Sequence, residues 1–328
     1  MSLWTRTKQW FGRWFRGPQS GRWTDGHASS WHGLVAFRPW VLPRRHFRLY
    51  VPAGWTRGAR APLIVLIHGC RQTPEAFAQG TRIAAAADRA GALVLMPDQK
   101  DSANPYRCWN WFDRRTWHGK GEAAIVDAMV RKVARRFDVD RERVTVAGMS
   151  SGAALAAVIG LRYPQRVSRI FAHSGLACGA AASAFTALTV MRRGPDQDVA
   201  AIAARTRAEA GDRRVALVVL HGGDDDVVAK LNAEALVRQY LAFNGVTVPP
   251  GASSTLPPHD QGGRDAPHAL RSVRTREWQR DGRTVVRLFE IGGLGHAWSG
   301  GDPAQPFNDP APPDATQLLV DFAAGPAE

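Results

Sequence analysis

Five short apolar runs, separated by segments of helical periodicity, constrain the fold of this chain more than any other feature. The runs occupy residues 63–67, 92–96, 143–147, 168–173 and 215–220. A continuous apolar run of this length is typical of a strand that is covered on both faces. The helical segments span residues 74–89, 122–137 and 229–243. Strands that alternate with such helices form a mostly parallel sheet with helices on both faces, so the sequence predicts an α/β fold.

Further elements complete one large domain, which we expect to extend over residues 32–328. Residues 46–51 alternate like a half-buried strand, and a hairpin is predicted from 272–278 and 284–291, with its turn at Asp281-Gly282. Residues 314–323 predict a closing helix. Residues 246–270 are rich in Pro, Gly, Ser and His, which indicates a surface insertion. The sequence contains no run of 18 apolar residues that would indicate a membrane-spanning helix.

The first 31 residues differ from the rest of the chain. Aromatic and apolar residues recur at helical spacing between residues 3 and 16, with arginine and lysine between them, and Gly17-Pro18 ends the pattern. This pattern predicts a basic amphipathic helix that lies on a membrane surface or packs on its own domain or on a subunit. The segment lacks the apolar region and the small-residue cleavage site of a signal peptide, so the compartment stays open.

The net charge is +14 and comes mostly from arginine, since the chain has five lysines. Such a charge is compatible with nucleic acid or an anionic membrane as partner. The arginines are scattered, however, and no nucleic-acid-binding motif is present, so we expect a basic solvated surface and no nucleic-acid partner. The three cysteines match neither a zinc site nor a redox C-x-x-C motif, so they leave the disulfide pairing open.

One glycine-rich pentapeptide carries the chemistry. Gly148-Met149-Ser150-Ser151-Gly152 stands between the strand at 143–147 and an apolar helical segment that starts at residue 153. A G-x-S-x-G turn in this context is the nucleophile elbow of α/β-hydrolases, and it predicts Ser150 as the nucleophile. The alternative is a strand-helix connection in which Ser150 caps the helix.

A serine nucleophile needs a base and an acid, which follow it along the chain in this fold. Five histidines come after Ser150: His173, His221, His259, His268 and His296. We predict His296 as the base, because its glycine-rich loop after a strand can bring the imidazole over the elbow.

The acid is expected after the strand at 215–220, where Asp224, Asp225 and Asp226 are adjacent. Three neighbouring carboxylates repel one another, so one is held inward while the others face water. Their spacing does not distinguish them.

Two backbone amides are predicted to form the oxyanion hole. One belongs to Ser151, the residue after the nucleophile. The other belongs to the loop after the strand at 63–67, where His68-Gly69-Cys70 stands. Gly69 leaves room for a substrate, and the Cys70 N–H is the expected donor.

Six motifs between residues 47 and 301 together indicate a family. They are His68-Gly69-Cys70, Cys108-Trp109-Asn110-Trp111-Phe112, Gly148-x-Ser150-x-Gly152, His173-Ser174-Gly175, His221-Gly222-x-x-Asp225-x-x-Val228 and Gly295-His296-Ala297-Trp298. This set resembles the polyhydroxybutyrate depolymerase-type serine esterases, which are related to feruloyl and acetylxylan esterases and belong to the α/β-hydrolase superfamily.

The resemblance implies several further properties. It selects Asp225 as the acid, and it implies esterase chemistry without metal or cofactor. It also implies an extracellular or periplasmic location. Because Cys70 and Cys108 both fall inside family motifs beside the proposed site, we predict a disulfide between them, with Cys178 as an ordinary small apolar residue.

Three tryptophans near the motifs are candidates for the substrate pocket. Trp109 and Trp111 could line an acyl site with Trp298 near its mouth, and the alternative for all three is structural packing.

The leading hypothesis is therefore a serine esterase that hydrolyses 3-hydroxybutyrate-type or other short acyl esters. A feruloyl or acetylxylan-type carbohydrate esterase, a peptidase and a non-catalytic membrane-associated module are the alternatives. The sequence shows no substrate-binding domain of the kind found in extracellular polymer depolymerases, so we expect soluble or amorphous esters as substrates. The acyl group and the alcohol stay open.

Overall fold

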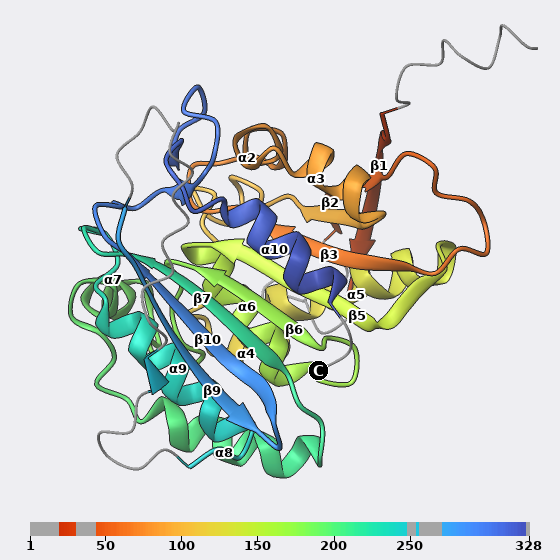
Figure 1. The fold of residues 1–328 in the computed structure, drawn as a ribbon. Helices are drawn as coiled ribbons and strands as arrows, with labels where there is room; N and C mark the ends of the chain where they lie inside the picture. The colour runs from red at the N-terminus through yellow and green to blue at the C-terminus, as the bar shows by residue number, and fades with distance from the viewer. Residues whose placement is uncertain (1–19, 31–43, 248–253, 256–270, 326–328) are drawn as a thin grey trace, which may run out of the picture.

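A ten-stranded sheet organises the protein (Figure 1). The computed structural model describes residues 20–30, 44–247, 254–255 and 271–325. The strand order is β1-β2-β4-β3-β5-β6-β7-β10-β9-β8. The strands are β1 (Arg22–Ser29), β2 (Arg44–Val51), β3 (Ala61–Ile67), β4 (Leu93–Pro97), β5 (Val139–Met149), β6 (Arg169–His173), β7 (Ala216–Gly222), β8 (Ser254–Thr255), β9 (Val273–Arg280) and β10 (Arg283–Ile291). The central strands from β4 to β10 are parallel to one another, whereas β1, β2, β9 and β8 pair antiparallel at the two edges.

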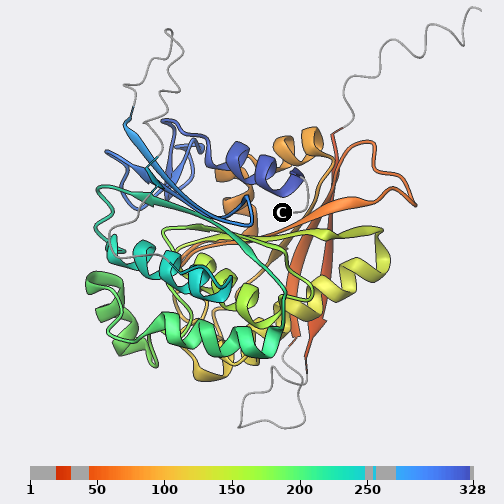
Figure 2. The same cartoon turned by 60° about the horizontal axis from the view of Figure 1, so that its bottom comes forward.

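Helices cover both faces of the sheet (Figures 1 and 2). One face carries α2 (Pro74–Thr81), α3 (Ile83–Ala90) and α10 (Ala315–Ala324). The other face carries α5 (Gly121–Arg136), α6 (Ser151–Arg162) and α9 (Leu231–Phe243), together with α4 (Arg114–Trp117), α7 (Ala184–Arg193) and α8 (Val199–Ala210). A pair of two-residue strands, β11 (Trp298–Ser299) and β12 (Asn308–Asp309), forms a separate small sheet.

The apolar runs form strands because each face of the sheet has its own core. Side chains alternate across a strand, so successive residues of β3 enter different cores. Leu63, Val65 and Ile67 pack on the α5, α6 and α9 side. Ile64 and Leu66 pack on the α2, α3 and α10 side. A run without polar residues is therefore required, as the sequence predicted.

Two expectations about the elements need correction. The helix expected over 74–89 is broken at Arg82, whose φ is 53°. Thr316 of α10 donates its hydroxyl to the carbonyl of Thr81 at 2.6 Å, so contact with another helix accompanies the break. The boundary at residue 31 is also wrong, because β1 pairs with β2 and makes residues 22–29 part of the domain.

Some expectations fall on residues that the structure does not describe. The amphipathic helix at 3–16 lies outside the described residues. So does most of the insertion at 246–270, of which Ser254–Thr255 forms β8. Among the described residues, no helix combines the length and the apolar character needed to cross a bilayer.

The parallel order decides where a site can form. The carboxyl ends of β5, β6, β7 and β10 lie at the same end of the sheet. Backbone hydrogen bonds continue between the segments that follow these strands. Ser150 N donates to His173 O at 2.9 Å, and Gly223 N donates to Ile291 O at 2.7 Å. The predicted functional loops therefore leave the sheet side by side.

Candidate active site

Ser150 lies in a sharp turn between β5 and α6. Its φ of 54° and ψ of −121° form a strained backbone conformation. A Cβ atom at Gly148 would lie 2.6 Å from the carbonyl carbon of Gly152, and one at Gly152 would lie 2.2 Å from Ile67 O. Both glycines are therefore required for strand and helix to pass this closely, as expected for a nucleophile elbow.

His296 and Asp225 form a closely paired couple. His296 Nδ1 lies 3.0 Å and 2.9 Å from the two carboxylate oxygens of Asp225. The Asp225 side chain is 0% exposed and the His296 side chain 9% exposed. Asp224 and Asp226 are exposed, so of the three neighbouring carboxylates Asp225 is the one held inward.

Backbone amides fix the orientation of the Asp225 carboxylate. Val227 N and Val228 N donate to Asp225 Oδ1 at 3.1 Å and 2.8 Å. Burial alone would raise the pKa of Asp225, but hydrogen bonds from His296 and Val228 and the charge of His296 outweigh it and lower the pKa to about 2. The carboxylate is therefore ionised at neutral pH and can hold an imidazolium.

The loops that carry Asp225 and His296 are hydrogen-bonded to each other. Asp224 N donates to Leu294 O at 3.0 Å. A Cβ atom at Gly222 would lie 2.2 Å from Leu294 O, so a side chain at this position would push the two loops apart. Gly222 thus permits the close approach of the loops that hold Asp225 and His296.

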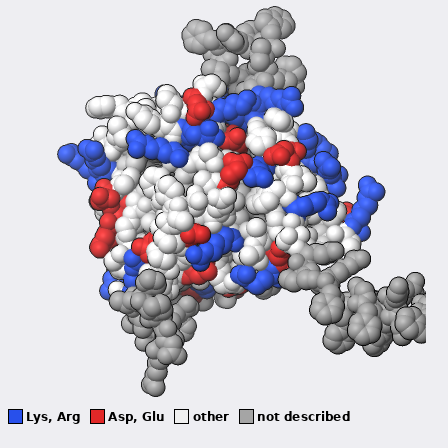
Figure 3. All heavy atoms as spheres, turned by 90° about the horizontal axis from the view of Figure 1, so that it is seen from above, with Lys and Arg blue, Asp and Glu red and all other residues white. Residues whose placement is uncertain are grey.

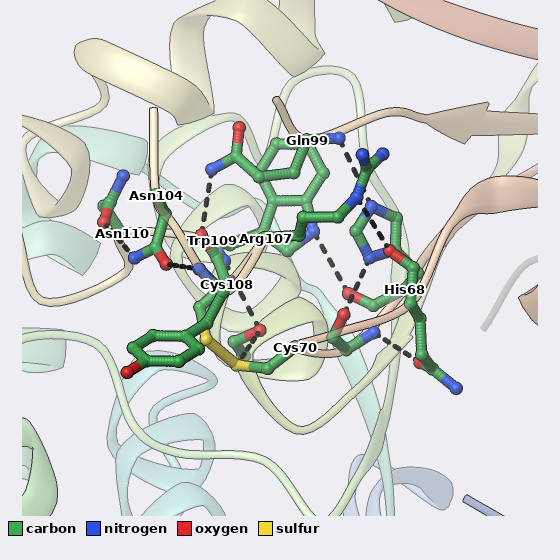
Figure 4. The surroundings of a disulfide bond; sticks show 12 residues. His68, Cys70, Gln99, Asn104, Arg107, Cys108, Trp109 and Asn110 are labelled. Atoms are coloured by element: carbon green, nitrogen blue, oxygen red, sulfur yellow. Dashed lines mark hydrogen bonds between the residues drawn. A yellow bond between two sulfur atoms is a disulfide. The ribbon is translucent and has the colours of Figure 1, made fainter. Parts of the chain in front are cut away.

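The loop after β3 passes directly over the elbow. A Cβ atom at Gly69 would come within 3.6 Å of Ser150 Cβ and 3.4 Å of Met149 O. Cys70 is joined to Cys108 by a disulfide with a Cα–Cα distance of 4.1 Å (Figure 4). Ser151 Oγ lies 3.4 Å from Cys70 Sγ and accepts a hydrogen bond from Trp109 N, also at 3.4 Å. The Cys70 loop, the Cys108 loop and the start of α6 therefore meet beside Ser150.

A buried carboxylate that the sequence reasoning missed holds the Cys108 loop. Glu122, in the first turn of α5, accepts hydrogen bonds from Gln99 Nε2 and Asn110 N, each at 2.6 Å, and from Asn110 Nδ2 at 2.9 Å. Burial raises the pKa of Glu122, and these hydrogen bonds oppose the rise. The only signal in the sequence was an acidic residue in the first turn of a helix whose buried face is mostly apolar. Acidic residues are common in the first turn of helices, so this signal does not stand out.

His68 is hydrogen-bonded within the same group of loops (Figure 4). Its Nε2 accepts from Gln99 N at 3.3 Å, and its Nδ1 donates to Gly69 O at 2.7 Å. Burial lowers the pKa of His68 to about 4, so the ring stays neutral in this arrangement. His173 is also fully buried, and burial lowers its pKa to about 3. Burial therefore keeps both rings neutral at neutral pH.

The predicted pocket tryptophans are nearly or fully enclosed. Trp298 is 0% exposed, packs against Phe77 and Phe171, and donates its indole N–H to Thr316 Oγ1 at 3.0 Å. The expectation that Trp298 lies near the mouth of a pocket is therefore corrected, because no part of its ring reaches the surface. Trp109 and Trp111 are 1% and 4% exposed, which fits the packing alternative.

A few large apolar side chains are exposed to solvent, and the sequence reasoning did not identify them. Six large hydrophobic residues in the described part of the chain are exposed: Tyr106, Phe185, Leu188, Val227, Leu231 and Phe307. We call this set the apolar collar. No sequence pattern predicts this set, because the exposure of single apolar residues depends on how the loops pack.

The remaining expected residues contribute no further ligands to the site. His221 is buried at the end of β7, and burial lowers its pKa. His259 and His268 lie outside the described residues. Over the described ranges, no three His, Cys, Asp or Glu side chains gather as metal ligands would.

Known proteins resemble this chain in sequence. Residues 45–256 match the family described as Esterase PHB depolymerase. Poly(3-hydroxyalkanoate) depolymerase C of Paucimonas lemoignei is 29% identical over 261 residues, which cover 78% of this chain and 58% of that protein. Feruloyl esterase B of Neurospora crassa is 28% identical over 222 residues, which cover 63% of this chain and 73% of that protein. The chain thus spans a little over half the length of the depolymerase.

Solved structures share the fold. Acetyl xylan esterase from Aspergillus awamori superposes with a TM-score of 0.66 at 19% identity, covering 83% of this chain and 94% of that one. An S-formylglutathione hydrolase from Agrobacterium tumefaciens gives a TM-score of 0.54 at 13% identity, covering 93% and 95%. Together with the mostly parallel sheet, these neighbours show the α/β-hydrolase fold that the elbow predicted.

Proposed function

Because the chain belongs to the esterase family of polyhydroxybutyrate depolymerases, we propose that it is a serine hydrolase of carboxylic esters with Ser150, His296 and Asp225 as its catalytic triad. The observation that carries this proposal is the buried Asp225–His296 pair. Its two residues follow the carboxyl ends of β7 and β10, at the same end of the sheet as the Ser150 elbow. The order Ser, Asp, His along the chain is that of the fold.

The chemistry follows from these positions. Ser150 Oγ attacks the ester carbonyl while His296 Nε2 takes its proton, and the imidazolium then protonates the leaving alcohol. Water next attacks the acyl-enzyme, with His296 again as base. Asp225 keeps the Nδ1–H tautomer and stabilises the imidazolium, which its pKa of about 2 allows at neutral pH.

The oxyanion is stabilised by the backbone N–H groups of Ser151 and Cys70. Ser151 is the first residue of α6, so the positive end of the helix dipole adds to its N–H. The disulfide ties Cys70 to the loop that Glu122 holds in place. Donors that are fixed before the reaction stabilise the transition state more than donors that must reorganise.

The substrate class is proposed from the relatives and from the apolar collar. The relatives are named as poly(3-hydroxyalkanoate) depolymerase and feruloyl esterase, and the collar includes the exposed Val227, whose N–H donates to Asp225. We therefore expect 3-hydroxybutyrate oligomers and short acyl esters to be cleaved. Feruloyl esters, acetylated xylo-oligosaccharides and a peptide amide complete the panel that separates the alternatives.

A disulfide beside the site suits an oxidising compartment, so the proposed location is extracellular or periplasmic. Peripheral membrane contact through residues 3–16 and the absence of a nucleic-acid partner stay predictions.

The triad is tested by Ser150→Ala. The variant is expected to lose turnover of p-nitrophenyl butyrate by a factor on the order of 10⁶ and to lose labelling by a fluorophosphonate, because no other group can form the acyl-enzyme. Ser102→Ala, which changes an exposed serine, is the matched control and should keep both activities. Full turnover in Ser150→Ala would contradict the proposed mechanism.

A further inference from the structure

Arginines line a groove at the end of the sheet where the parallel strands begin. This end is opposite the proposed active site. Two adjoining cavities of about 430 Å³ and 340 Å³ form the groove, and both are lined by Arg141, Gln165 and Arg166. We call it the arginine groove. Its arginines are Arg131, Arg135, Arg141, Arg166, Arg169, Arg213, Arg214 and Arg283.

The parallel topology brings these residues together. Arg169 and Arg283 are the first residues of β6 and β10, and Arg141 lies near the start of β5. Arg213 and Arg214 lie just before β7, separated from it by Val215, and β7 lies between β6 and β10 in the sheet. Neighbouring strands are about 4.8 Å apart, so the amino ends from β5 to β10 place guanidinium groups along a line of about 15 Å.

The acidic residues nearby neutralise about half of this charge. Glu142 and Asp212 line the groove itself. Asp127 pairs with Arg131 at 3.0 Å and with Arg166 at 2.6 Å. Asp281 pairs with Arg214 at 2.5 Å. Arg131, Arg166 and Arg214 are thus ion-paired.

Four of the arginines are exposed and make no ion pair with any described residue: Arg135, Arg141, Arg213 and Arg283. They are free to bind an anion. On the face shown in Figure 3, by contrast, basic and acidic side chains are interspersed around an uncharged area.

We propose that the arginine groove binds a linear oligoanion of phosphate groups. Guanidinium groups bind phosphate oxygens through paired, charge-assisted hydrogen bonds, and their arrangement in a line suits an elongated ligand. No aromatic residue is among the described residues that line the two cavities, so the groove offers no stacking surface for nucleobases. None of the six residues of the apolar collar lines either cavity, so the groove lacks the exposed large apolar residues with which a protein enters a membrane.

This site is separate from ester hydrolysis. β6 runs from the groove to the elbow side over five residues, which corresponds to about 16 Å. Binding in the groove therefore leaves Ser150 accessible, and the proposal stands or falls independently of the esterase assignment.

The test uses the full chain and tripolyphosphate as the probe. The triple variant Arg141→Ser, Arg213→Ser and Arg283→Ser removes three unpaired charges from the groove. The control variant Arg192→Ser, Arg193→Ser and Arg238→Ser removes three exposed arginines that lie outside it. Isothermal titration at low salt should show saturable binding to the unaltered protein, at least tenfold weaker binding to the groove variant, and binding within twofold of the unaltered protein in the control.

Binding measurements with other ligands identify the class of ligand. Inorganic phosphate should bind more weakly than tripolyphosphate, because it spans fewer arginines, and added salt should weaken both. Equal losses in the two triple variants, or no saturable binding, would overturn the proposal, since general charge would then account for the result. Stronger groove-dependent binding to phosphatidylglycerol vesicles or to a single-stranded oligonucleotide than to tripolyphosphate would also overturn it. Hydrolysis of p-nitrophenyl butyrate, measured in parallel, should not change in either variant.

Discussion

At the scale of single residues, the site depends on backbone geometry. Sequence patterns predict this geometry at Ser150 but not at Asp225. A strained residue such as Ser150 costs on the order of 1–3 kcal/mol and persists only where its surroundings hold it. The G-x-S-x-G spacing predicts that strain, because both glycines are needed for the close approach. The choice of Asp225 among three aspartates could not be derived from spacing alone, because it depends on which carboxylate meets the Val227 and Val228 amides.

Replacement of Asp225 by asparagine tests the acid. Asparagine keeps the shape but cannot hold the imidazole in the correct tautomer or stabilise its charge, so kcat for a p-nitrophenyl ester should fall by roughly 10³- to 10⁴-fold. Steady-state kinetics at neutral pH measure this. Asp224→Asn makes the same change at the exposed neighbour and should stay close to the unaltered enzyme. Equal effects of the two substitutions would argue against Asp225 as the acid.

At the scale of elements, the long apolar strands were predictable and the contacts between loops were not. β3 and β7 are buried along their whole length, so their sequences contain a clear signal. The break at Arg82 and the role of Glu122 arise from partners distant in sequence, namely Thr316 and Asn110. β1 was missed because it is an edge strand of mixed polarity, in which Trp23 packs on Tyr50.

Removal of the disulfide tests the link between the two loops. The double variant Cys70→Ser and Cys108→Ser should lose about 4 kcal/mol of the free energy of unfolding on the chain-entropy account, since the bond closes a separation of 38 residues. Its kcat should also fall, because the Cys70 amide is then less firmly placed for the oxyanion. Urea denaturation and ester kinetics measure the two effects.

Cys178→Ala is the matched control, since it removes the one free cysteine among the described residues and keeps the bond. An unchanged kcat in the double variant would show that the loop holds its position without the disulfide.

At the scale of the whole molecule, the two cores on either side of the sheet enclose histidines that stay neutral. The pKa of His68 is about 4 and that of His173 about 3, both because burial disfavours the charged ring. In the unfolded chain each histidine binds a proton near its ordinary pKa of about 6.5. Between about pH 6.5 and 4 these two histidines therefore bind more protons in the unfolded state than in the folded state.

Stability should consequently decline on acidification within this window. Two such histidines lower the free energy of unfolding by up to about 2.7 kcal/mol per pH unit. Urea denaturation at pH 7, 6 and 5 measures the decline. His68→Gln, which removes one titrating ring, should be less stable at pH 7 but should show a shallower decline. Equal stability of the unaltered protein at pH 7 and pH 5 would contradict the assignment of neutral buried rings.

The arginine groove has a practical consequence for handling the protein. A bead or electrode that carries sulfonate groups would attract the molecule by the edge where the strands begin, so that Ser150 faces the solution. Such a film should turn over dissolved esters at nearly the rate of free enzyme, whereas chemical coupling at random positions would bury a share of the sites against the support. The fold thereby supplies an orientation for immobilisation without any added tag.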